Sequence, residues 1–205
     1  DHTPLDYMEC YAKIVLEQVL SRSFEKLAVL DKPDLQFPDG SIGIEVTQAV
    51  DSDQLRAESL YTGITYGSVR NEDRAKKEIK KCGCEYQDGI LRGKPGGDSF
   101  KLILGAVEAK LATINKGGYA TFREYDLFIL SDISSNEKMR QEALESMVKL
   151  SEEYKIIFDK IMVLVPGNFY IFNLKQQDCQ VIDITGEQQF QMACLARKMV
   201  DDSMK

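Results

Sequence analysis

Apolar residues near the N-terminus recur at intervals of three and four positions. They are Leu5, Met8, Ala12, Val15 and Val19. Because an α-helix turns once every 3.6 residues, this spacing places all five side chains on one stripe. The pattern predicts an amphipathic helix over about residues 5–20 with one buried face.

Two short apolar-alternating runs follow, one on each side of the pair Asp39-Gly40. An Asp-Gly pair is a strong hairpin signal, because both central positions of a two-residue turn require a positive φ. We therefore expect strands over residues 33–37 and 42–47, with Asp39 and Gly40 forming the turn between them.

Counting outward from this turn gives the register of the hairpin. Asp34 then faces Glu45, and side chains two residues apart share a face of the sheet. The expected core face carries Leu35, Phe37, Ile42, Ile44 and Val46. The opposite face carries Asp34, Gln36, Gly43, Glu45 and Thr47. This second face combines two acids and a hydroxyl with a glycine that leaves room for something to approach.

The rest of the chain alternates helical and strand-like patterns. Helices are expected over 54–61, 69–81, 99–117, 136–154 and 187–202. Nearly continuous apolar runs at 125–130 and 160–165 are typical of strands buried on both faces, and 169–173 and 179–184 add two more. The glycine-rich segment 82–97 is expected to be the least ordered. This order predicts an α/β fold with a mixed central sheet flanked by helices.

Length and composition favour one globular domain over residues 1–205. The chain is long enough to bury a full core, with 43% hydrophobic and 29% charged residues. No apolar run approaches the ~20 residues that span a bilayer, and the N-terminus lacks the pattern of a secretory signal. The five cysteines are scattered, as expected for reduced thiols. We therefore expect a cytoplasmic protein that does not associate with membranes.

The formal net charge of −7 argues against nucleic-acid binding by bulk electrostatics, so any such contact must be local. The best local candidate is a basic cluster made of Arg70, Arg74, Lys76, Lys77, Lys80 and Lys81. Acids at positions 72, 73 and 78 interrupt this cluster, and such a pattern is usually only a solvated helix face.

Two carboxylates directly opposite each other destabilise a sheet. The sheet would tolerate Asp34 opposite Glu45 if one carboxyl group were protonated, if both side chains splayed into water, or if a divalent cation bridged them. Hard oxygen ligands suit Mg²⁺ or Mn²⁺. The simplest alternative is a solvated hairpin edge with two surface acids.

Asp34, the hairpin turn and Glu45-Val46-Thr47 resemble the acidic core of the PD-(D/E)XK (restriction-endonuclease-like) nuclease superfamily. In that family an Asp opens one strand and a Glu-x-Lys follows on the next. Glu9, Ala12 and Leu16 are similar in spacing to the first helix of its resolvase-like branch. Glu17 competes with Glu9 for the acidic position.

The resemblance implies an αβββαβ core with C-terminal additions and hydrolysis of phosphodiester bonds, with DNA as the expected substrate. It implies a metal ion, Mg²⁺ or Mn²⁺, bound by Asp34, Glu45 and the main-chain carbonyl of Val46. Glu9 would contribute directly or through a water. A homodimer is also common in the family.

The chain departs from the family pattern at Thr47, where a lysine is usual. Lys32 faces Thr47 in the same counting and is one substitute for that lysine. Gln48 is another, as a residue that orients water if the strand ends in a bulge. Helix lysines form the third group: Lys76, Lys77 and Lys110. The competing hypothesis is a catalytically inactive nuclease-like domain that serves as a binding or assembly module.

Overall fold

The computed structural model describes residues 5–20, 24, 26–94 and 97–205. The chain divides into two compact units. The larger unit consists of Asp1–Ala49 and Ser99–Lys205, and the smaller unit is Val50–Asp98. The smaller unit is therefore inserted into the sequence of the larger one. The expectation of one domain over residues 1–205 stays a prediction.

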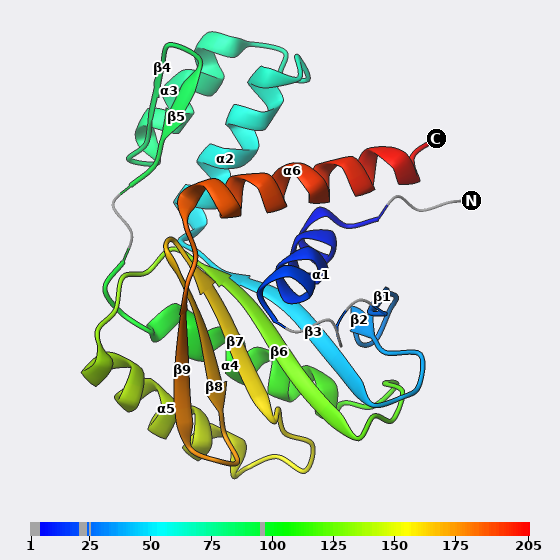
Figure 1. Ribbon diagram of the computed structural model, residues 1–205. Coiled ribbons are helices and arrows are strands. Elements are labelled where there is room, and N and C mark those ends of the chain that lie inside the picture. Colours follow the sequence, from blue (N-terminus) through cyan, green and yellow to red (C-terminus); the bar gives the residue numbers. More distant parts are fainter. Residues whose placement is uncertain (1–4, 21–23, 25, 95–96) are drawn as a thin grey trace. The chain divides into compact units, whose positions relative to one another are not determined.

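The larger unit is built on a seven-stranded sheet with the order β1-β2-β3-β6-β7-β8-β9 (Figure 1). The strands are β1 (Ala28–Val29), β2 (Leu35–Gln36), β3 (Ile42–Ala49), β6 (Glu124–Ser131), β7 (Lys160–Val165), β8 (Asn168–Asn173) and β9 (Asp178–Asp183). Strands β3, β6 and β7 are mutually parallel, whereas the other neighbours are antiparallel. The predicted α/β class with a mixed central sheet is confirmed.

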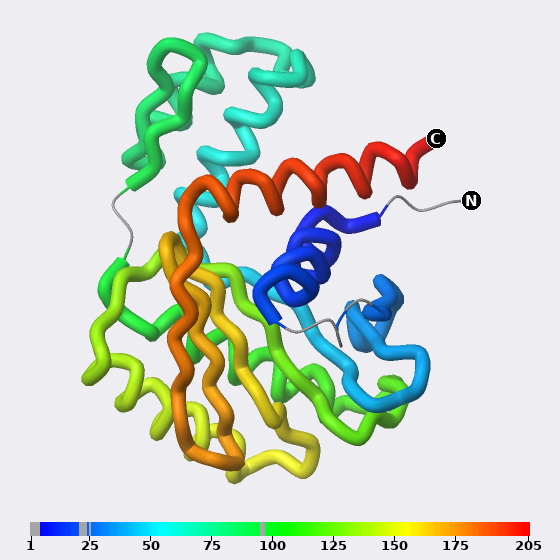
Figure 2. Tube along the Cα trace, viewed as in Figure 1, coloured from blue at the N-terminus to red at the C-terminus, as the bar shows by residue number. Residues whose placement is uncertain are grey.

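Four helices cover the two faces of this sheet. They are α1 (Tyr7–Val19), α4 (Lys101–Asn115), α5 (Glu137–Ser151) and α6 (Gly186–Ser203). Residues far apart in sequence meet here, since α1 lies beside α6 (Figure 2). None of the helices in the described ranges is long and apolar enough to cross a membrane.

The sheet separates two apolar cores. The core on one face combines α1 and α6 with strand residues such as Phe128, and the core on the other face combines α4 and α5 with Leu127 and Ile129. Neighbouring residues of β6 thus enter opposite cores, because successive side chains of a strand point to opposite faces. A strand buried on both faces is what the continuous apolar run at 125–130 predicted.

The register of the β2–β3 hairpin is the predicted one. Leu35 pairs with Ile44, and both side chains are fully buried. The turn differs, because Gly40 N–H donates to the Phe37 carbonyl and centres the turn on Pro38 and Asp39. Proline favours the first central position of such a turn. Of the turn residues 38–40, only Gly40 has a positive φ, of 70°. A two-residue turn at Asp39-Gly40 would need a positive φ at both positions, so that expectation is wrong.

The smaller unit contains α2 (Ser52–Thr65), α3 (Glu72–Lys81), β4 (Glu85–Gln87) and β5 (Ile90–Arg92). The expectation of little order over residues 82–97 is wrong for the described part of that segment, since β4 and β5 form a hairpin. Its turn residues Asp88 and Gly89 have φ values of 53° and 76°. The Tyr61 hydroxyl on α2 donates to the Gly89 carbonyl and holds the turn.

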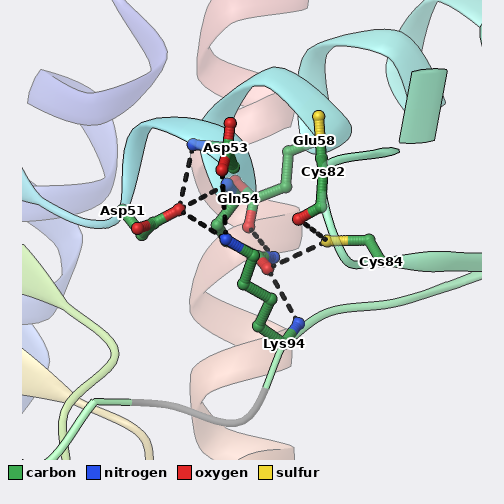
Figure 3. A network of polar contacts seen from close by, with 7 residues as sticks. All are labelled: Asp51, Asp53, Gln54, Glu58, Cys82, Cys84 and Lys94. Atoms are coloured by element: carbon green, nitrogen blue, oxygen red, sulfur yellow. Dashed lines mark hydrogen bonds and ion pairs between the residues drawn. The ribbon is translucent and has the colours of Figure 1, made fainter. Parts of the chain in front are cut away.

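A polar network ties the two ends of the smaller unit together (Figure 3). The Gln54 side-chain oxygen on α2 accepts from Lys94 N–H at 3.1 Å and lies 3.4 Å from the Cys84 thiol. The Lys94 ammonium lies 3.1 Å from Asp51 and 3.3 Å from Asp53. Because residues 51 and 94 lie near the two ends of the segment, this network closes the insertion on itself.

Candidate active site

The ammonium group of Lys110 lies close to both acids of the hairpin. Its Nζ lies 2.6 Å from Glu45 Oε2 and 4.0 Å from Asp34 Oδ2. Asp34 comes directly before β2, one step beyond the Leu35–Ile44 pair, as the count from the sequence placed it. Both carboxylates therefore face the same side of the sheet, and the positive charge between them comes from α4.

The period of β3 explains why Glu45 meets α4. Ile44 and Val46 enter the core shared with α1, so Glu45 points to the opposite face, where α4 packs. The Glu45 side chain is only 2% exposed, whereas that of Lys110 is 24% exposed. Burial raises the pKa of Glu45, and the hydrogen bond from Lys110 opposes that rise. A buried carboxylate is thus held beside a cation that still touches solvent.

Asp34 is fixed by the main chain of β3. Its Oδ2 accepts a hydrogen bond of 2.7 Å from Val46 N–H. Strand β2 ends its pairing with β3 at Ile44, so the Asp34 carboxylate takes the place of a strand partner for Val46. Since the N–H and C=O of one residue point to the same side of a strand, we expect the Val46 carbonyl to face this carboxylate as well.

One oxygen of Glu45 has no protein partner. Within the described residues, Oε1 is buried and accepts no hydrogen bond, although its companion Oε2 is paired with Lys110. An unsatisfied buried acceptor costs about 1–3 kcal/mol, so native proteins rarely leave one without a purpose. A bound metal ion, a water or a closer approach of the neighbouring Tyr119 hydroxyl would satisfy this oxygen.

Glu9 is electrostatically coupled to the two acids. Burial raises its pKa to about 7, and the negative charge of Asp34 is the next largest cause, with a smaller contribution from Glu45. Glu9 lies in the first turn of α1, which Asp6 caps by accepting hydrogen bonds from Met8 and Glu9 N–H. Glu17, the competing candidate, is paired with Lys13 instead.

Tyr119 adds a phenol to the site that no sequence pattern predicted. Its pKa rises to about 12, chiefly through burial and then through the negative charges of Glu45 and Asp34. The hydroxyl therefore stays protonated at neutral pH as a hydrogen-bond donor. Tyr119 follows the C-terminal end of α4, in a segment without a recognisable motif.

Two of the predicted substitutes for the missing lysine do not reach Glu45. Lys32 is exposed, with a φ of 55°, in the turn that joins β1 to β2, where Leu30 N–H donates to the Asp34 carbonyl. That reversal ends the hairpin pairing, so the expected Lys32–Thr47 pair is wrong. Gln48 follows a regular β3–β6 register without a bulge and points to the face opposite Glu45.

Among the helix lysines, Lys110 alone contacts the acids. Lys76 and Lys77 belong to α3 in the smaller unit, and Lys76 is paired with Glu72 at 2.6 Å. Thr47 is half-buried on the same face of β3 as Glu45, as predicted. Glu45 is therefore approached by an ammonium from α4 and not by a side chain that follows it on β3.

The glycine on this face of the hairpin is not an open approach path. A Cβ atom at Gly43 would lie 2.5 Å from Pro33 Cγ and 2.9 Å from Phe122 Cδ2. Those side chains fill the space above Gly43, so the expectation that its absent side chain leaves room for a ligand is wrong. Glycine is required here for packing.

The oxygen donors at this site decide which metal ion it could hold. In the described part of the chain, no group of three or more His, Cys, Asp or Glu side chains is arranged to hold a metal. Mg²⁺ does not require one, because it commonly binds through one or two carboxylates plus waters and substrate phosphates. Asp34, Glu45 with its unpartnered oxygen and the Val46 carbonyl are hard oxygen donors of that type.

Comparison of the chain with protein-family models, with curated proteins and with solved structures gives no match. The candidate site therefore rests on its own geometry.

Proposed function

We propose that the protein is a metal-dependent nuclease of the restriction-endonuclease-like class that hydrolyses phosphodiester bonds in DNA. The observation that carries this proposal is the convergence of Asp34, Glu45 and Lys110, with one buried oxygen of Glu45 left without a partner among the described residues. Two carboxylates with an ammonium beside them match what the PD-(D/E)XK resemblance implies, with the lysine supplied from a helix.

The order of elements supports the same class. In the larger unit α1 is followed by β1, β2, β3, α4 and β6, which is an αβββαβ order once the smaller unit is set aside. Helix α5, strands β7, β8 and β9 and helix α6 follow this core as C-terminal additions. The smaller unit interrupts this core between β3, which carries Glu45, and α4, which carries Lys110.

Each residue has a defined part in the proposed reaction. Asp34, Glu45 and the Val46 carbonyl would hold a Mg²⁺ or Mn²⁺ ion, and Glu9 would contribute through a water. When bound, the ion would lower the pKa of a bound water and stabilise charge on the scissile phosphate. Lys110 keeps a positive charge beside Glu45, where it orients the attacking water or offsets charge on the phosphate.

A second candidate function is a catalytically inactive binding or assembly module. The observation that favours it is the Lys110–Glu45 ion pair itself, because Lys110 neutralises the buried carboxylate without a metal ion. Either candidate function allows the homodimer that the family resemblance makes common.

Nuclease assays separate the two candidates. Wild-type protein and Glu45→Gln are incubated with duplex, single-stranded and branched DNA, and with RNA, in Mg²⁺, in Mn²⁺ or in EDTA. The nuclease proposal expects metal-dependent cleavage of DNA by the wild type that Glu45→Gln abolishes. Folded wild-type protein that cleaves no substrate in either metal favours the module.

A further inference from the structure

The excess of acidic residues in this chain belongs to the larger unit. The smaller unit contains equal numbers of acidic and basic residues, so the net charge of −7 arises outside it. Within the smaller unit the charges are unevenly placed. Arg74, Lys77 and Lys81 on α3 are all exposed and follow i, i+3, i+7 spacing, which puts them on one helical face.

The opposite side of α3 is packed. Ala75 and Ile79 are buried in the core of the smaller unit, together with Cys82 and Cys84. Lys76 points away from the basic face, because it pairs with Glu72 and lies 4.7 Å from the centre of the Tyr86 ring. The helix is therefore anchored through one side and presents its basic face outward.

The carboxylate of Glu78 forms ion pairs with two cations at this basic face. Glu78 Oε2 lies 2.8 Å from Arg56 of α2, and Glu78 Oε1 lies 2.6 Å from Lys81. Both cations remain mostly exposed, at 61% and 72%. With Arg74 and Lys77 alongside, four cations surround one acid, so the face has a clear positive excess although neighbouring residues are acidic.

We propose that this face, defined as Arg56, Arg74, Lys77 and Lys81, binds the phosphate backbone of duplex DNA. Arg74 and Lys81 are separated by about 10 Å along the helix axis, at 1.5 Å per residue. Duplex DNA carries one negative charge per about 1.7 Å of its axis, so a row of cations of that length meets several phosphates. Backbone contacts of this kind position the polymer without reading its sequence.

The connectivity of the chain links these phosphate contacts to the candidate site. The smaller unit leaves the larger one directly after β3 and returns just before α4, the two elements that carry Glu45 and Lys110. A polymer held by α3 is thereby tethered to the unit that carries the candidate site. This inference rests on the proposed function for its polymer, and its test is independent of cleavage.

Binding is measured by fluorescence anisotropy with a short labelled DNA duplex in EDTA, which removes any cleavage. Wild type is compared with Arg74→Glu/Lys77→Glu and with the control Lys138→Glu/Lys149→Glu on α5, whose lysines are also exposed. Both double variants change the net charge equally. Thermal melting checks that both are folded, and an RNA duplex of the same length serves as the comparison polymer.

We expect the α3 variant to bind the DNA duplex at least tenfold more weakly and the α5 variant to bind within twofold of wild type. The slope of log affinity against log salt, over about 50–200 mM, should fall by about 0.9 for each phosphate that the α3 variant no longer neutralises. Equal weakening by both variants, no weakening by the α3 variant, absence of wild-type binding, or binding to RNA alone would each overturn the inference.

These outcomes are distinguishable from failure of the nuclease proposal. A wild type that binds DNA through α3 and cleaves nothing keeps the inference and removes the nuclease activity. Metal-dependent DNA cleavage by the wild type, together with binding by the α3 variant that is as tight as wild type in EDTA, keeps the nuclease and removes the inference.

Discussion

The Nζ of Lys110 on α4 lies 2.6 Å from Oε2 of Glu45 on β3, across 65 residues of sequence. The pair joins a nearly inaccessible carboxylate to an ammonium that is 24% exposed. It explains how the chain keeps two acids close together on one hairpin although no lysine follows Glu45 on β3.

Lys110→Met should destabilise the protein, because it leaves the Glu45 carboxylate buried without its counter-charge. The loss should be about 3 kcal/mol, near the low end for a broken buried pair, since Lys110 is partly exposed. Chemical denaturation in EDTA measures it. The double variant Lys110→Met/Glu45→Gln should recover much of the loss, and a single variant as stable as wild type would mean that the ion pair does not form.

Asp34 should tolerate an amide better than an alanine. Asp34→Asn keeps an oxygen that accepts from Val46 N–H and also removes repulsion with Glu45, so its stability should stay within about 1 kcal/mol of wild type. Asp34→Ala leaves that N–H unpaired and should cost about 1–3 kcal/mol. Urea unfolding of both variants without metal compares them, and equal losses would show that the hydrogen bond contributes nothing.

Glu9 should make stability depend on pH. Its pKa in the folded protein is about 7, above the ordinary value of 4.5, so the folded state holds its proton more tightly than the unfolded state does. Its contribution is therefore fully present below about pH 4.5 and is lost as pH rises to about 7.

The comparison of wild type with Glu9→Gln isolates this effect from the other acids. Relative to Glu9→Gln, the wild type should lose more than about 1 kcal/mol between pH 4.5 and pH 7, since one unit of pKa shift corresponds to about 1.4 kcal/mol. Unfolding curves across this range without metal provide the measurement. Parallel stability profiles for the two proteins would mean that the folded protein does not raise the pKa of Glu9.

Mg²⁺ or Mn²⁺ should raise the melting temperature of the wild type by binding selectively to the folded state. The gain reaches about 2.7 kcal/mol only at a hundredfold excess over the dissociation constant, so titration must extend well beyond that constant. Glu45→Gln should lose the response. Lys110→Met should respond more strongly, because its Glu45 carboxylate no longer has a competing cation. Equal metal responses in wild type and Glu45→Gln would exclude Glu45 as a ligand.

The local parts of the fold were predictable from sequence because they depend on neighbouring residues. Alternation around the hairpin gave the correct Leu35–Ile44 register even though the turn was misplaced, since the four-residue loop closes the same pairs. The two-residue Asp-Gly turn occurs at Asp88-Gly89 instead. The sequence feature that distinguishes the two Asp-Gly pairs is the proline that precedes Asp39, since no proline lies beside Asp88.

The non-local parts of the site were not predictable in the same way. Lys110 was one of several helix lysines, and only the packing of α4 against β3 distinguishes it. Lys32 was placed by extending a strand that in fact begins at Leu35, because nothing in the sequence marks that boundary. The filling of the space at Gly43 by Phe122 likewise depends on a loop almost 80 residues away.

We propose that Lys110 completes a metal-dependent cleavage site. The most direct test of this proposal is the rate of DNA cleavage in Mn²⁺ by wild type, Lys110→Met and the control Lys101→Met, which removes an exposed lysine from the same helix. We expect cleavage by the wild type and Lys101→Met at similar rates, and a loss of about a hundredfold or more in Lys110→Met. Cleavage by folded Lys110→Met at the wild-type rate would contradict it.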